Sequence, residues 1–63
     1  RLLMREVLFN YGECQIQRDK SPDGIPRWIV TWKDGSMQTY NAAWYHLKVV
    51  RQFVEAKLQN DSI

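Results

Sequence analysis

Cysteine and histidine are the residue types that most often do nucleophilic or metal chemistry, and this sequence has one of each, Cys14 and His46. A thiol–imidazole pair also needs a group that orients the imidazole, and no such motif surrounds either residue. One Cys and one His cannot supply the four ligands of a structural zinc site. We therefore predict no catalytic residue, no metal and no cofactor, and a protein that is not an enzyme.

Aromatic side chains are better candidates for a functional role, because three Trp, three Tyr and two Phe exceed what one small core comfortably hides. Aromatic residues left at a surface commonly anchor protein–protein contacts. We predict that Trp28, Trp32 or Tyr40 reaches a partner, and that Trp44 lies in the core.

Length and charge narrow the class of protein. The 63 residues predict a single domain (1–63) of marginal stability, because a chain this short buries only about 60% of its unfolded surface. A formal net charge of +2, with cations scattered among acids, lacks the dense basic patch of nucleic-acid-binding domains. No apolar run approaches the ~18 residues of a membrane helix. The chain begins with Arg1 instead of Met, so we expect a segment of a longer protein, and its single thiol fits a reducing compartment.

Residue patterns in the sequence predict the strands and the helix that must position these side chains. An Asp-Gly turn at 34–35 joins a strand at 25–33 to a second strand at 36–40, which is a strong hairpin signal. Further β-prone segments precede the hairpin at 2–9 and 13–18. We predict that these segments form a curled, three-stranded antiparallel sheet.

A C-terminal helix is predicted at 41–60, followed by a fraying tail at 59–63. Asn41 is a good N-cap, and the apolar residues after it recur at spacings of three and four, as on one face of a helix. That face consists of Trp44, Leu47, Val50, Val54 and Leu58. The fold class is therefore α+β, with one helix packed across the sheet.

The motif Trp-Ile-Val-Thr-Trp-Lys-Asp-Gly at 28–35 resembles the chromo family, the chromodomains and chromo shadow domains of chromatin proteins. The first strand, Tyr40 and the helical segment Val-Val-Arg-Gln-Phe-Val-Glu at 49–55 are also similar to the family pattern, although the loop at 11–26 is longer than usual. The resemblance implies a chromodomain-like fold and a nuclear protein.

Some chromodomains bind methyl-lysine in a cage of three aromatic side chains, through cation–π attraction. The resemblance places Trp32 at one wall, but the other walls fall at Leu2 and at Gly35 or Ser36, which are not aromatic. A histone-tail reader with a non-standard cage is therefore an alternative, and affinity graded by lysine methylation would favour it.

Chromo shadow domains lack this cage and pair through the C-terminal helix, so the resemblance implies contacts from Val50, Arg51, Val54 and Leu58. Arg51 stands where such domains place an apolar residue at the centre of the two-fold contact. Two unpaired arginines meeting there would cost several kcal/mol, which argues against an ordinary homodimer. A monomer and a chromo-family heterodimer stay open.

These observations predict a non-catalytic docking or dimerisation module of a nuclear, chromatin-associated protein, such as a heterochromatin or silencing factor. Its partner is expected to be another chromatin protein or a peptide of one, bound on the helix face or along an edge of the sheet. A second alternative is a nucleic-acid-binding chromo-type module of a retroelement integrase, which binding that is insensitive to salt would exclude.

Overall fold

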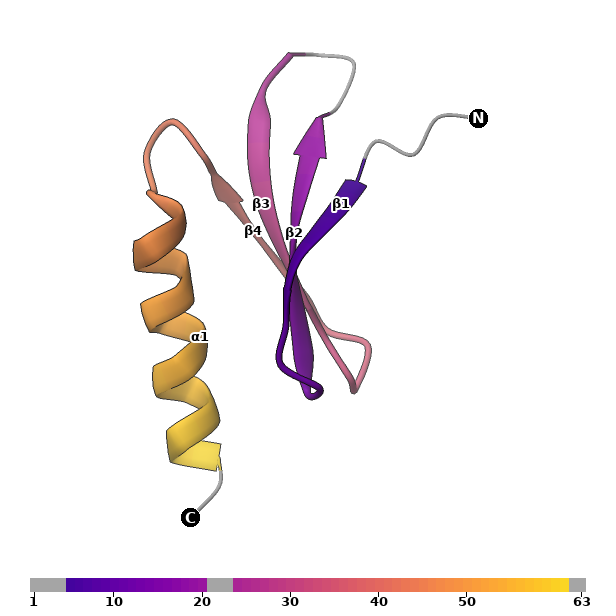
Figure 1. Cartoon of the computed structure of the whole chain (residues 1–63), viewed down its shortest axis with the longest axis vertical. Coiled ribbons are helices and arrows are strands. Elements are labelled where there is room, and N and C mark those ends of the chain that lie inside the picture. Colours follow the sequence, from indigo (N-terminus) through magenta and orange to yellow (C-terminus); the bar gives the residue numbers. More distant parts are fainter. Residues whose placement is uncertain (1–4, 21–23, 62–63) are drawn as a thin grey trace.

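A four-stranded antiparallel sheet and one C-terminal helix form the fold. The computed structural model describes residues 5–20 and 24–61. The strands follow one another across the sheet in chain order, and the helix lies on one side of them (Figure 1). The elements are β1 (Arg5–Asn10), β2 (Cys14–Lys20), β3 (Pro26–Trp32), β4 (Met37–Asn41) and α1 (Leu47–Asp61). The α+β class and the C-terminal helix agree with the sequence prediction, but the prediction of three strands was wrong.

The fourth strand results from a tight turn between β1 and β2. The Tyr11 N–H donates to the Cys14 carbonyl at 2.9 Å, and the Gly12 N–H donates to Asn10 Oδ1 at 2.9 Å. Gly12 has a φ of 89°, which glycine adopts without steric cost. The chain therefore reverses, so that β1 pairs with β2, with a bulge between Val7 and Phe9. Residues 2–4 of the predicted first strand lie outside the described residues.

The hairpin of β3 and β4 forms as predicted around the Asp-Gly turn. Gly35 has a φ of 96°, and its N–H donates to the Trp32 carbonyl at 2.9 Å. The Asp34 carboxylate closes the turn by accepting the Ser36 N–H at 2.9 Å and the Ser36 hydroxyl at 2.7 Å. Side-chain and main-chain bonds thus fix the same turn.

The core lies between α1 and one face of the sheet. Alternation along β2 and β3 brings Cys14, Ile16 and Val30 to this face, where they are buried against Val50 and Val54 of the helix. Burial of five small and medium side chains gives a modest core, as expected for a domain of this size.

The helix begins at Leu47, six residues after the predicted start. Asn41 caps a separate turn instead, in which its side chain accepts the Ala43 N–H at 2.8 Å and its carbonyl accepts the Trp44 and Tyr45 N–H groups, each at 3.0 Å. His46 is the residue that caps α1, because its Nδ1 accepts the Lys48 N–H at 3.1 Å. The helix continues to Asp61, which includes the first part of the predicted tail. Residues 62–63 lie outside the described residues.

Candidate functional site

The helix face predicted to contact a partner is turned into the protein's own core. Val50 is 0% exposed and Val54 is 2% exposed, so neither can contact another polypeptide while the domain is folded. Leu58 is partly buried and packs against the same cluster. The prediction of a binding surface at Val50 and Val54 is therefore corrected, because the core of so small a domain needs both residues.

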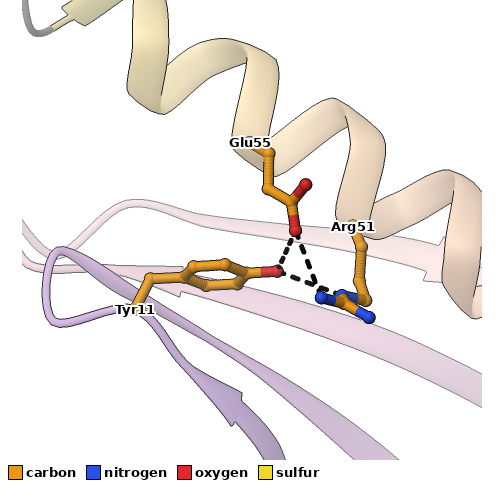
Figure 2. Close-up of polar contacts among 3 residues, drawn as sticks. All are labelled: Tyr11, Arg51 and Glu55. Atoms are coloured by element: carbon orange, nitrogen blue, oxygen red, sulfur yellow. Dashed lines mark hydrogen bonds and ion pairs between the residues drawn. The ribbon is translucent and has the colours of Figure 1, made fainter.

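Arg51 is engaged within the domain as well. Its Nε donates to the Tyr11 hydroxyl at 3.3 Å, and its terminal nitrogen lies 3.4 Å from Glu55 Oε2 (Figure 2). The guanidinium also lies 4.2 Å from the centre of the Phe9 ring, within the range of a cation–π contact. The bond to Tyr11 raises the pKa of Arg51, whereas partial burial raises the pKa of Tyr11. Arg51 thus joins α1 to the β1–β2 turn.

Trp28 connects the sheet to the segment before the helix. Its indole N–H donates to the Tyr45 carbonyl at 2.7 Å, and the Arg18 guanidinium lies 5.5 Å from the centre of its ring. The side chain is partly buried against the core. Trp28 therefore holds the backbone of the β4–α1 connection in place.

Four aromatic residues on and after β4 form what we call the aromatic patch: Tyr40, Trp44, Tyr45 and Phe53. The rings of Tyr40, Tyr45 and Phe53 contact one another, with centroid distances of 5.4, 5.9 and 6.2 Å. Tyr45 is 40% exposed and Phe53 is 46% exposed. The patch contains one residue predicted to reach a partner, Tyr40, and joins it to two that the sequence did not identify.

Trp44 belongs to this patch and not to the core, so its predicted burial was wrong. It is 81% exposed, because residues 42–46 form a turn that precedes the helix. A helix starting at Asn41 would have rotated Trp44 toward the sheet. The later start leaves the indole in solvent, next in sequence to Tyr45.

Trp32 lines a separate open cavity of about 510 Å³, between the two hairpin turns and the second half of α1. Its ring carries the Lys57 ammonium 5.3 Å from the centroid, and its indole N–H is buried without an acceptor among the described residues. The lining residues are Glu13, Trp32, Lys33, Asp34, Ser36, Lys57 and Leu58. Trp32 is the single aromatic residue among them. Leu2, the predicted position of another wall, lies outside the described residues.

The sequence contains one Cys and one His, and both lie among the described residues. Cys14 is 2% exposed, and burial raises the pKa of its thiol, which disfavours the reactive thiolate. His46 caps the helix. Within 5–20 and 24–61, no three His, Cys, Asp or Glu residues lie close enough together to hold a metal ion. None of the helical segments described is long and apolar enough to span a membrane.

Among known proteins, no family model, curated sequence or solved structure is similar enough to this chain to count as a match. The likeness to the chromo family thus stays a prediction from sequence motifs.

Proposed function

We propose that this domain is a non-catalytic docking module of the chromo type, which binds an apolar segment of another chromatin-associated protein in the nucleus. The observation that carries the proposal is the aromatic patch. Three rings in mutual contact lie at the margin of the core, two of them at least 40% exposed, and the indole of Trp44, next in sequence to Tyr45, is exposed as well. Aromatic groups in such positions are the residues that dominate binding energy at protein interfaces.

Three members of the patch are positioned before any partner arrives. Tyr40 is fixed by β4, Phe53 by α1, and the Tyr45 backbone by the 2.7 Å bond from Trp28. Pre-ordered side chains lose less conformational entropy on binding, so more of the contact energy contributes to affinity. This supports a docking role in which the patch receives apolar side chains of the partner.

The chromo-type assignment is supported by the order of the elements and by the hairpin that contains the Trp-Lys-Asp-Gly motif. An antiparallel sheet followed by one helix packed on its face agrees with the order of elements that the resemblance implies, although the sheet has four strands instead of three. The alternative, a methyl-lysine reader, is less well supported. The ammonium of Lys57 already lies over the ring of Trp32, and among residues 5–20 and 24–61 no second aromatic residue lines the cavity beside it.

Selection of peptides from a random displayed library against the purified domain tests the proposal directly. We expect enrichment of apolar, uncharged sequences, and a synthetic peptide of this kind should lose at least about tenfold in affinity with Phe53→Ala or Trp44→Ala. Val7→Ala is the matched control, because Val7 is 51% exposed on β1, the edge strand opposite β4. Equal affinity for Phe53→Ala, Trp44→Ala and the unmodified domain would show that the patch is not the docking site.

A further inference from the structure

The outer edge of β4 has main-chain groups that point away from the sheet. The Trp32 N–H donates to the Ser36 carbonyl at 2.8 Å, and the Ala42 N–H donates to the Pro26 carbonyl at 3.0 Å. In an antiparallel ladder the bonded pairs alternate with unbonded ones. Continuing this register along β3 and β4 makes Thr39, opposite Ile29, an unbonded position. The N–H and carbonyl of Thr39 are therefore directed outward.

The same reasoning applies to the other alternate positions of β4. Met37 lies opposite Thr31 and Asn41 lies opposite Arg27, so their main-chain groups also face outward. The Asn41 carbonyl is already used by the turn that follows the strand. Met37 and Thr39 thus offer both donor and acceptor, and Asn41 offers its N–H.

The two edges of this sheet differ in how they are protected. Natural proteins blunt an exposed edge strand with charged residues, proline or a bulge. β1 contains Arg5, Glu6 and the bulge between Val7 and Phe9. β4, with the sequence Met-Gln-Thr-Tyr-Asn, contains no charge and no proline, and its pairing with β3 is regular. β4 is therefore the edge suited to accept another strand.

We infer that two copies of this chain pair through β4, antiparallel, about a two-fold axis that passes beside Thr39. In this register each Thr39 N–H donates to the Thr39 carbonyl of the other copy, and the Asn41 N–H donates to the Met37 carbonyl. This pairing satisfies the N–H and carbonyl of Thr39, the Asn41 N–H and the Met37 carbonyl. It does not use the Met37 N–H or the Asn41 carbonyl, which is already occupied. The two four-stranded sheets become one continuous sheet.

The absence of charged residues on β4 favours a second copy of this chain as the partner strand. Near a two-fold axis each side chain meets its own copy, so any ionised residue there would meet a like charge. The five residues of β4 are all uncharged, and the central one is threonine, whose cross-strand pairing with threonine is favourable. Pairing of β4 with β1 of a second copy would bring in the bulge and the charges of β1, and would form open-ended chains.

The inference goes beyond the proposed docking function and does not depend on it. The aromatic patch is built from side chains, whereas the pairing uses the main chain at the edge. A domain with a small core also gains stability from association, which adds burial that one copy cannot provide.

Sedimentation velocity over a concentration series tests the pairing. We expect the unmodified domain to form a dimer, and Thr39→Lys and Thr39→Glu each to lose it through like-charge repulsion at the axis. An equimolar mixture of the two variants should recover the dimer, which a misfolded variant could not do. Thr31→Lys is the matched control, because Thr31 is one strand further from the edge on the same face, and this variant should stay dimeric.

Three results would overturn the inference: a monomer at every concentration, a dimer that persists in both Thr39 variants, or a mixture that stays monomeric. Hydrogen exchange at the Thr39 amide gives a second readout, since its protection should rise with protein concentration. Binding of the library-selected peptide by Thr39→Lys separates the two proposals. Retained binding by this variant supports the docking function whatever the oligomeric state.

Discussion

Tyr11 and Glu55 are 44 positions apart in the sequence, and the hydroxyl of the tyrosine donates a 2.9 Å hydrogen bond to the carboxylate of the glutamate (Figure 2). Tyr11 lies in the turn between β1 and β2, and Glu55 lies in α1. Arg51 completes the group by contacting both. This is a polar connection between the N-terminal hairpin and the helix, at the margin of the apolar core.

Tyr11→Phe should lower the free energy of unfolding by about 0.5–1 kcal/mol. The substitution keeps the ring against the core and removes the hydroxyl that joins Arg51 to Glu55, and hydrogen bonds at partly exposed sites have modest net value. Chemical denaturation measures the change. Tyr40→Phe is the matched control, because the Tyr40 hydroxyl lies 3.5 Å from Gln38 Oε1 and should contribute little. Equal losses for the two variants would show that the Tyr11 hydroxyl contributes no more to stability than the Tyr40 hydroxyl does.

The β3–β4 hairpin could be predicted from sequence because its signal is local: Asp34 and Gly35 fix the turn by their own conformational preferences. The β1–β2 hairpin has a weaker signal. Tyr11-Gly12 resembles a simple break, and only the pairing with β2 shows that the residues before it form a separate strand. The count of strands therefore depended on a contact between segments, which a local pattern does not contain.

The helix start and the aromatic patch were missed for a related reason. Both Asn41 and His46 can cap a helix, and sequence preference selects Asn41, whereas the structure uses Asn41 to cap a short turn. That shift moves Trp44 into solvent. Phe53 lies at the border of the apolar stripe, and its exposure is decided by Val50 and Val54 having already filled the core.

Val50→Ala should lower the free energy of unfolding by about 2 kcal/mol, since it removes two buried methyl groups and leaves part of a cavity. The assignment of Val50 to the core, and not to a partner interface, predicts this loss in the isolated domain. Thermal unfolding followed by circular dichroism measures it. Gln52→Ala, on the exposed side of the same helix, should change stability by less than about 0.5 kcal/mol. If Val50→Ala left the free energy of unfolding unchanged, Val50 would have to be assigned to a partner interface and not to the core.

His46→Asp should stabilise the domain by about 0.5–1 kcal/mol. Aspartate is a preferred N-cap, and α1 has no acidic residue in its first turn to interact with the positive end of the helix dipole. His46→Asn supplies a capping oxygen without charge, so the difference between the two variants isolates the dipole effect. His46→Ala should be less stable than the unmodified domain, because the Lys48 N–H loses its 3.1 Å acceptor. If none of the three substitutions changed the melting temperature, His46 would not be the residue that caps the helix.

Acid should destabilise the domain in part through Asp34. The bonds from the Ser36 N–H and hydroxyl hold the pKa of Asp34 below its usual value of 3.8. A carboxyl group whose pKa is lower in the folded than in the unfolded state contributes stability that is fully present above pH 3.8 and is lost as the pH falls through the folded value.

The measurement compares the unmodified domain with Asp34→Asn, which keeps a turn-forming side chain but cannot titrate. The difference in their unfolding free energies should be constant near neutral pH and should shrink below pH 3.8, because the carboxylates that both proteins share cancel. Ser36→Ala removes the hydroxyl donor and keeps the backbone donor. The difference in unfolding free energy between Ser36→Ala and the double variant that also carries Asp34→Asn should therefore shrink less. If the unfolding free energies of the unmodified domain and of Asp34→Asn instead fall in parallel down to the acid transition, the pKa of Asp34 is no lower in the folded domain than in the unfolded chain.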